Sequence, residues 1–182
     1  ANKRLLKYSA VGKVNGIEFD THYDITRLAD GKIKKITGSV LQQGFGASTS
    51  AYTPVYVAGS SKLAYVLNEH TTIIGNITDS AVYSYNAANQ VIEKETFSEA
   101  LGFPLPGQKE TYTYDASGNL TSHKVYNSIG SGSPYTLSLT VAYTYSTHKS
   151  YRTLGEESYI ILSAENVSKN EVVKTVNDYG SN

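Results

Sequence analysis

The alternation of apolar and polar residues is clearest between residues 136 and 146. The apolar positions there are Leu137, Leu139, Val141, Tyr143 and Tyr145, and Ser, Thr and Ala fill the positions between them. Because strand side chains point to opposite faces in turn, this spacing predicts a β-strand with one buried face. Helical periodicity is nearly absent. Even the Glu-rich segment 93–102 is interpreted, in its first half, as a strand.

The segment "YTYDASGNL", residues 112–120, has the pattern of a β-hairpin tip. Tyr112 and Tyr114 fall on one strand face, and Asp115 is the short polar residue that starts a type I turn. Gly118 lies three residues later, where the chain needs a positive φ. A type I turn followed by a left-handed residue is a common hairpin connection. We therefore predict a positive φ at Gly118, and also at Gly31 in a looser copy of the segment.

Copies of this segment recur at a nearly constant spacing. Tyr114 corresponds to Arg27, Val57, Tyr85 and Tyr145, at spacings of 30, 28, 29 and 31 residues along the chain. Three copies carry the pattern Tyr-x-Tyr. Residues that repeat in register usually pack repeat against repeat. We therefore predict that the tyrosines form a ladder in one core layer and do not serve as a sugar-stacking platform.

Turn clusters divide the chain into consecutive strands, which predicts an all-β antiparallel meander of about 12–13 strands built from hairpin repeats of about 30 residues. Twisted open sheets of more than about 10 strands curl or split. The sheet should therefore curl into a barrel or half-barrel. The prediction is a single domain over residues 1–182, with its repeat core at about 20–155. Charges on both strand faces of residues 32–35 argue against a membrane-spanning barrel.

The segment "YTYDASGNL" resembles the tyrosine–aspartate (YD) repeat of Rhs-type proteins. The layout of the chain also resembles secreted lipoprotein domains of unknown function from gut Bacteroidetes, some with a porin-like fold. The match is good over residues 112–120, but the Asp is replaced by Asn86, Ser146, Leu28 and Ala58 in the other copies. Five short copies are too few for the toxin-enclosing shell of Rhs proteins. The resemblance implies export to the periplasm or outer-membrane surface, with a lipid anchor upstream.

Composition narrows the class of partner. Sixteen basic residues balance sixteen acidic ones, which argues against nucleic acid as the partner. The chain has no cysteine and therefore no thiol nucleophile or cysteine metal site. Sixteen Tyr, four Phe and no Trp are typical of wet sheet faces. The chain contains no segment of 18 consecutive apolar residues, so no transmembrane helix is predicted.

Candidate chemistry is sparse, and we predict that the chain is not an enzyme and holds no cofactor. No catalytic or nucleotide-binding motif is present. His22 and Asp24 share a strand face and could ligate a metal, but an ordinary polar face is the simpler interpretation. Glu93 and Glu95 form a same-face carboxylate pair of the kind that glycosidases use, although solvated sheet faces often carry such pairs.

The loops opposite the hairpin tips are the predicted functional end, because binding groups tend to lie on loops held by a rigid scaffold. These loops are interpreted as longer than the tips, and they carry apolar residues that are costly to leave in water: Phe45, Ile73, Ile74, Phe103, Leu105 and Tyr135. Two interpretations stay open. Either the loops plug the open end of the curled sheet, which we favour, or they present an apolar patch to a partner.

The resulting hypothesis is a non-catalytic, exported and surface-anchored β-repeat domain that acts as a binding or structural module, with a glycan or a protein as partner at the cell surface. The alternative is a curled sheet that binds a glycan or a small apolar ligand in its lumen or at its loop end. A closed cavity lined by convergent polar groups would favour the alternative. A buried carboxylate pair would favour an enzyme.

Overall fold

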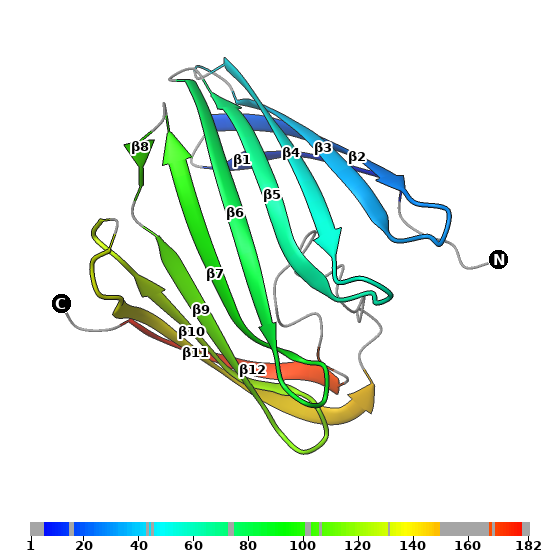
Figure 1. The fold of residues 1–182 in the computed structure, drawn as a ribbon, viewed down its shortest axis with the longest axis vertical. Coiled ribbons are helices and arrows are strands. Elements are labelled where there is room, and N and C mark those ends of the chain that lie inside the picture. The colour runs from blue at the N-terminus through cyan, green and yellow to red at the C-terminus, as the bar shows by residue number, and fades with distance from the viewer. Residues whose placement is uncertain are drawn as a thin grey trace.

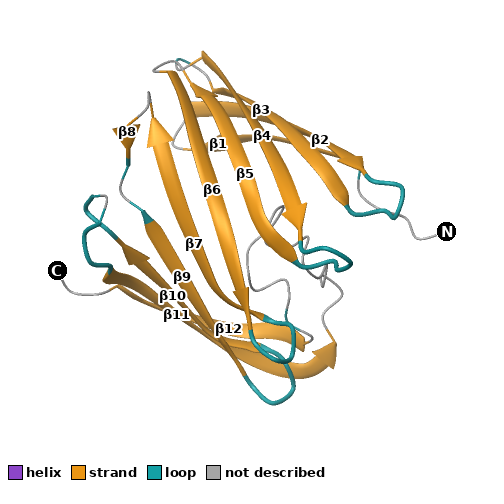
Figure 2. Ribbon diagram, in the orientation of Figure 1, coloured by secondary structure: helices purple, strands orange, loops and turns teal. Residues whose placement is uncertain are grey.

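The structure, a computed structural model, describes residues 6–14, 17–42, 44, 46–72, 75–100, 103–105, 107–130, 132–149, 168 and 170–179. Every regular element in these residues is a β-strand (Figure 2). The strands are β1 (Lys7–Val14), β2 (Ile17–Arg27), β3 (Ile33–Gln42), β4 (Gly46–Tyr56), β5 (Leu63–Thr72), β6 (Gly75–Tyr85), β7 (Val91–Ala100), β8 (Phe103–Pro104), β9 (Gln108–Tyr114), β10 (Leu120–Asn127), β11 (Thr136–Lys149) and β12 (Asn170–Tyr179). No helix of the described residues is long and apolar enough to cross a membrane.

The strands form one antiparallel sheet in which each strand pairs with the next along the chain. The short β8 departs from this path, because it pairs with the end of β7 while β9 pairs with the rest of that strand. The sheet curls strongly but does not close, so that β1 and β12 form its two edges (Figure 1). The predicted all-β meander is therefore confirmed, with twelve strands and the shape of an open half-barrel. The Glu-rich segment 93–102 begins within β7, a strand, as predicted.

The core lies on the inner face of the curl, toward the hairpin-tip end. Along β6, Ala81 and Tyr83 are buried, whereas the alternating residues Val82 and Ser84 are exposed. The same alternation leaves one buried face on the neighbouring strands, because the cross-strand register places buried residues opposite one another. The buried apolar residues are Ile25, Ile33, Ile36, Leu63, Val66, Ala81, Tyr83, Val91, Tyr112, Leu120 and Val141.

A ladder of tyrosine hydroxyls links successive hairpins, which confirms the predicted structural role of the repeat. Each tyrosine that ends the first strand of a hairpin reaches the first residue of the second strand in the preceding hairpin. The Tyr56 hydroxyl donates to the Ile33 carbonyl at 3.0 Å, and the Tyr114 hydroxyl donates to the Val91 carbonyl at 2.8 Å. The Tyr85 hydroxyl contacts both polar atoms of the buried Leu63 backbone. It accepts from the amide at 2.8 Å and donates to the carbonyl at 3.0 Å.

The other tyrosine of each Tyr-x-Tyr pair, two residues earlier in the chain, packs in the same core layer. Tyr83 and Tyr112 belong to the main buried cluster, and Tyr143 packs against it. At the last copy Ser168 replaces a direct ladder contact. Its hydroxyl lies 2.6 Å from the Tyr145 hydroxyl and 3.1 Å from the Leu120 amide. The ladder therefore reaches the last copy of the repeat through Ser168, which lies beyond the repeat core in the chain.

Two details of the predicted repeat are wrong. In the second copy the anchor is Tyr56 rather than Val57, because the turn at 57–62 is one residue longer than the turn at 86–90. This places Arg27, Tyr56, Tyr85 and Tyr114 at equal spacing. In the last copy β11 continues through Lys149, so the predicted turn just after Tyr145 is absent. Leu137 also departs from the predicted face, because the β10–β11 register shifts beside it and leaves it exposed.

Removing the Tyr85 hydroxyl tests the ladder. Tyr85→Phe leaves both the amide and the carbonyl of a buried residue without this partner, so we expect the free energy of unfolding to fall by about 2 kcal/mol. Tyr56→Phe and Tyr114→Phe each leave only a carbonyl, for which about 1 kcal/mol is expected. Tyr65→Phe is the control, because Tyr65 lies exposed on the outer face. Urea unfolding curves measure all four variants. Equal losses for Tyr85→Phe and Tyr65→Phe would show that the ladder bonds do not stabilise the sheet.

Three of the hairpin tips, at 28–32, 86–90 and 115–119, share one backbone hydrogen-bonding pattern. Gly31 and Gly118 have φ values of 89° and 86°, as predicted, and Asn89 occupies the equivalent position with φ 65°. The tip of the β9–β10 hairpin is closed by hydrogen bonds from the Asp115 amide to the Asn119 carbonyl, at 2.9 Å, and from the Asn119 amide back to the Asp115 carboxylate, at 2.8 Å. Each tip therefore needs one residue that tolerates the left-handed region.

We expect Gly118→Val to lower the free energy of unfolding by on the order of 1–2 kcal/mol, because a β-branched residue at this φ is strained. Asn89→Gly is the matched variant at the equivalent position. It should be neutral or slightly stabilising, since glycine relieves the same strain. Thermal unfolding compares the two. A tolerated valine at position 118 would mean that the turn rearranges at no cost.

Candidate functional site

The connections opposite the hairpin tips lie at one end of the sheet, as predicted, because each joins the second strand of one hairpin to the first strand of the next in an antiparallel meander. Their predicted lengths are wrong in part. The β3–β4 and β5–β6 connections span only 43–45 and 73–74, since the strands extend further than the turn residues suggested. Longer connections occur at 101–107, which contains β8, and at 128–135. The longer connections are therefore concentrated beside β7, β9 and β10.

The six predicted contact residues do not form one group in the structure. Phe45, Ile73 and Ile74 lie outside the described residues. The side chain of Phe103 on β8 is 71% exposed, so the favoured interpretation as a plug is wrong for this residue. Ile129, in the 128–135 connection, is also exposed. Leu105 and Tyr135 come from different connections and meet at the wall of one cavity.

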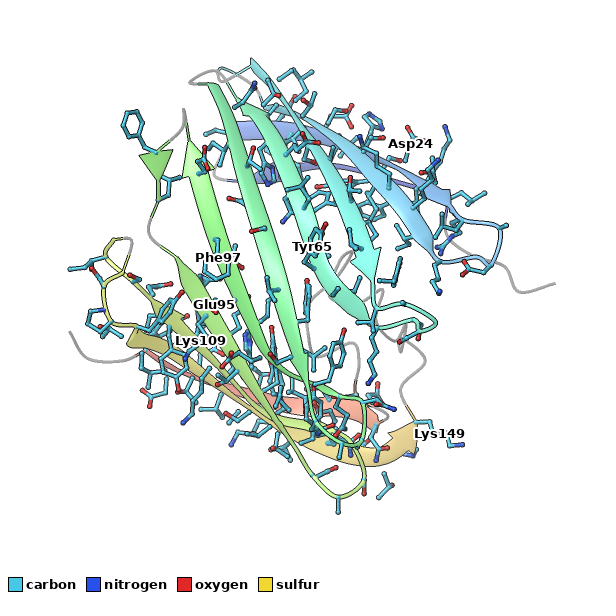
Figure 3. The ribbon with its side chains drawn as sticks, in the orientation of Figure 1. Asp24, Tyr65, Glu95, Phe97, Lys109 and Lys149 are labelled. Atoms are coloured by element: carbon cyan, nitrogen blue, oxygen red, sulfur yellow. The ribbon has the colours of Figure 1, made fainter. Side chains whose placement is uncertain are left out.

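The cavity has a volume of about 310 Å³. It lies where the 101–107 and 128–135 connections meet the loop end of β7, and Figure 3 labels Glu95 and Phe97 on that strand, with Lys109 on the adjacent β9. Glu95 and Phe97 lie on the outer face, opposite to the face of Ala81 and Tyr83. The described residues that line the cavity are Glu95, Phe97, Ser98, Leu105, Gly107, Ser128, Gly130, Gly132, Ser133 and Tyr135.

A carboxylate and a phenol meet in the wall of the cavity. The Tyr135 hydroxyl donates to Glu95 Oε1 at 2.9 Å. Burial and the hydrogen bond to Glu95, together with the charges of Glu95 and Glu93, raise the pKa of Tyr135 above its ordinary value. The Lys109 ammonium lies 5.4 Å from the centre of the Tyr135 ring and 3.9 Å from Glu93. Glu95 Oε2 accepts no hydrogen bond from the described residues, so one carboxylate oxygen is available to a ligand.

Ser128 and Gly107 position the tyrosine-bearing connection. The buried Ser128 hydroxyl lies 2.6 Å from the Gly130 carbonyl and 3.2 Å from the Ser133 carbonyl, and it holds the turn between them. The Ser128 amide donates to the Gly107 carbonyl at 3.0 Å, which ties the two connections together. A Cβ atom on Gly107 would lie 2.9 Å from the Tyr135 hydroxyl. Glycine at this position therefore leaves room for the Tyr135 hydroxyl beside Glu95.

This arrangement suits non-covalent binding of a small ligand. Phe97, Leu105 and the Tyr135 ring offer apolar surface, and Glu95 offers a hydrogen-bond acceptor. Ser98 and Ser133 also line the cavity and carry hydroxyl groups. Hydrolysis of a glycosidic bond requires two carboxyl groups that flank it, whereas the described lining contains Glu95 alone. Its partner in the predicted pair, Glu93, instead faces Lys109.

Sequence reasoning found Leu105 and Tyr135 but missed the rest of the cavity wall. Glu95 was noted only as half of a carboxylate pair, and Phe97 falls in an ordinary strand alternation. The only sequence feature that points to this cavity wall is the set of glycines at 107, 130 and 132, because glycines near apolar residues allow close backbone approach to a ligand. That signal does not say which two connections meet, because their contact depends on the curl of the sheet.

A second cluster of polar residues lies on the inner face and is centred on Glu110. Lys94 Nζ lies 2.6 Å from Glu110 Oε1, while His123 Nε2 lies 2.6 Å from Oε2. The Tyr112 hydroxyl also donates to Oε2, at 2.9 Å, and the Tyr112 ring stacks on His123 at 4.9 Å between centres. Burial, the largest effect, raises the pKa of Glu110, but the hydrogen bonds with His123, Lys94 and Tyr112 and the charge of Lys94 outweigh it and lower the pKa to about 2.

The repeat shows that this cluster replaces apolar packing. Where the fourth copy has Glu110, four residues before its anchor, the last copy has the buried Val141. Where the third and fourth copies have Lys94 and His123, the second has the buried Val66. Both Glu110 carboxylate oxygens are occupied by protein groups, and the carboxylate pair that would favour an enzyme is absent among the described buried residues. We therefore treat the cluster as structural.

His22 and Asp24, which were considered as metal ligands, have other partners in the structure. His22 Nε2 lies 3.0 Å from Asp20 Oδ1, and Lys7 Nζ lies 3.0 Å from Asp24 Oδ1. Among the described residues, no three His, Cys, Asp or Glu side chains are grouped closely enough to hold a metal ion. The two residues therefore make ordinary polar contacts with neighbouring side chains on the exposed outer face of β2.

Comparison with known proteins assigns no family to this architecture. A scan against protein-family models and a search of curated proteins find no match to the chain. The resemblance of residues 112–120 to the YD repeat therefore stays a prediction.

Proposed function

We propose that this chain is a non-catalytic β-repeat binding module, and that its loop-end cavity takes a small neutral saccharide. The observation that carries the proposal is the meeting of Glu95, Tyr135, Phe97 and Leu105 around one cavity. A sugar ring has an apolar face, which suits the aromatic and aliphatic wall. It also has hydroxyl groups, which can donate to the open Glu95 oxygen and exchange hydrogen bonds with the serine hydroxyls of the cavity wall.

The size of the cavity limits the ligand. A volume of about 310 Å³ lies at the small end of the range for ligand pockets. This favours one or two sugar rings over an extended lipid. The binding free energy expected for such a shallow contact is about −4 kcal/mol, which corresponds to millimolar dissociation constants. The exposed side chains of Phe103 and Ile129 in the same two connections offer further apolar contact to the aglycone part of a larger conjugate.

Titration with simple sugars tests the proposal by protein NMR. Glucose, galactose, N-acetylglucosamine and their common disaccharides are added to the ¹⁵N-labelled chain. We expect saturable shifts at the amides of Phe97, Gly107 and Gly130 for at least one sugar. Glu95→Gln should weaken binding about tenfold through loss of a charge-assisted hydrogen bond. Gly107→Ala should weaken binding, because the added methyl group would lie 2.9 Å from the Tyr135 hydroxyl and push it away from Glu95.

Glu99→Gln is the matched control, since Glu99 is an exposed carboxylate on the same strand, outside the described lining of the cavity. Its affinity should equal that of the unmodified chain. Shifts confined to inner-face residues such as Ala81 would place the ligand in the lumen instead. No shift with any sugar, but saturable shifts with an apolar probe such as anilinonaphthalene sulfonate, would contradict a saccharide and favour an apolar ligand.

We also propose an exported and surface-anchored location, which rests only on the resemblance to the YD repeat and to secreted lipoprotein domains. A protein at the cell surface would meet saccharides there, which is consistent with the proposed ligand. Fractionation of cells that express the natural gene product tests the location. Recovery in the cytosol would contradict it without affecting the binding proposal.

A further inference from the structure

The edge strand β12 is unusually accessible. From Val173 to Tyr179 every side chain is exposed, on the inner face as well as on the outer face. Val173, Val176 and Tyr179 are 60%, 47% and 71% exposed. Among the described residues β12 pairs only with β11, so the backbone groups on its other side face no described strand (Figure 1). A long edge strand rich in β-branched residues is a template for pairing with another strand.

The other edge of the sheet differs in its charges. β1 carries Lys7 and Lys13, and lysines on an edge strand oppose pairing with a like strand. In β12 the charges have both signs, with Lys174 and Asp178 four residues apart on the outer face. A strand with this pattern can pair with a copy of itself, because antiparallel pairing reverses the order of the charges.

The sequence of β12 selects one register for such a pair. A two-fold axis perpendicular to the sheet keeps both curls on the same side, and it must pass through a residue so that side chains of one face meet. With the axis at Val176, the opposite residues are Val173 with Tyr179, Lys174 with Asp178, Thr175 with Asn177, and Val176 with itself. An axis at Lys174 places two lysines opposite each other. An axis at Thr175 leaves Lys174 opposite Val176, without a charged partner.

We propose that two copies of this chain associate through β12, antiparallel and with Val176 on the two-fold axis, and so extend the curled sheet across both molecules. Each dimer then contains two Lys174–Asp178 pairs on its outer face. It also places Val173 of each copy opposite Tyr179 of the other. Cross-strand pairs of opposite charge, and pairs of aromatic with β-branched residues, are those that stabilise antiparallel sheets.

Single cysteines test the register, because the chain has none of its own. Opposite residues of an antiparallel pair have Cα atoms about 4.5–5.5 Å apart, within the range of a disulfide. We expect Val176→Cys to form a disulfide-linked dimer under mild oxidation. Val173→Cys is the matched control on the same strand. In the proposed register its two copies are six residues apart, or about 20 Å, and should not link. Val11→Cys on β1 reports the background rate.

Charge exchange tests the same interface without oxidation. Sedimentation velocity should show a concentration-dependent dimer of the unmodified chain. Lys174→Asp and Asp178→Lys each place two like-charged pairs in the dimer, and each should raise the dissociation constant at least about tenfold. The double variant exchanges the charges and should restore the dimer. Lys13→Glu on β1 should leave it unchanged. All of these side chains are exposed, so the fold of the monomer tolerates the changes.

A monomer at every concentration would overturn the proposal. Equal disulfide formation by Val173→Cys and Val176→Cys would overturn the register, and a dimer insensitive to Lys174→Asp would place the contact elsewhere. Circular dichroism of each variant confirms that the sheet is intact. The loop-end cavity is distant in sequence from β12 and shares no residue with it, so loss of the dimer should leave sugar binding intact.

Discussion

Replacing Glu110 by Gln is expected to lower the free energy of unfolding by about 3 kcal/mol, because it leaves the Lys94 ammonium in a largely buried site without its anionic partner. Glu110 is only 9% exposed, and its two oxygens hold Lys94 and His123 at 2.6 Å each. Urea unfolding measures the loss. A change below 0.5 kcal/mol, the usual size for a surface site, would show that Lys94 turns to solvent at no cost.

Replacing the whole cluster by apolar residues should have the opposite outcome. Lys94→Ile, Glu110→Leu and His123→Leu together remove every charge, and Tyr112→Phe removes the hydroxyl that would lose its acceptor. We expect this fourfold variant to be as stable as the unmodified chain or more stable, because well-packed apolar residues often replace a buried ion pair without loss. The buried Val66 and Val141 already fill equivalent positions of other copies. If the variant with all four substitutions were less stable than Glu110→Gln, the interpretation of the cluster as a replacement for apolar packing would be wrong.

The Glu110 cluster also predicts how the free energy of unfolding depends on pH. The pKa of Glu110 is lowered from 4.5 to about 2 on folding. The group therefore contributes stability that is fully present above pH 4.5 and is lost as the pH falls from 4.5 toward 2. The loss should be on the order of 3 kcal/mol. The fourfold apolar variant lacks this contribution, so its unfolding free energy should decline less over the same pH range.

Leu63→Ala is the second large effect that we expect, with a loss of about 2–5 kcal/mol. The Leu63 side chain is fully buried, and it starts the second strand of its hairpin. Alanine removes most of its apolar surface and leaves a cavity that the tyrosine ladder prevents from collapsing, because Tyr85 holds the backbone at both polar atoms. Chemical denaturation measures the loss.

Leu41→Ala provides the matched control, since Leu41 is 58% exposed near the opposite end of a strand. It should change stability by less than about 0.5 kcal/mol. Ile33→Ala and Leu120→Ala should resemble Leu63→Ala, because both side chains are fully buried at the equivalent position of other hairpins. If only one of the three variants were destabilised, the repeat would not set the core packing.

Alternation and turn chemistry in the sequence already determined the strands and their order. The pattern around Tyr112, Asp115 and Gly118 predicts a hairpin, because the pleat alternates side chains and a type I turn needs a left-handed residue after it. Consecutive hairpins then leave a meander as the simple topology. The near-regular spacing also indicated that the tyrosines pack together. These features depend on local conformation and on neighbours along the chain, which sequence patterns report directly.

Contacts between distant segments were decided by the tertiary structure alone. The predicted anchor Val57 proved to be Tyr56, because one extra turn residue shifts the register in a way that only the partner strand reveals. The meeting of Glu95 with Tyr135, and of Ser168 with Tyr145 and Leu120, depends on how far the sheet curls. Curl results from the summed twist of many strand pairs, and no short window of sequence records it. The location of the cavity therefore emerged only once all the strands were in place.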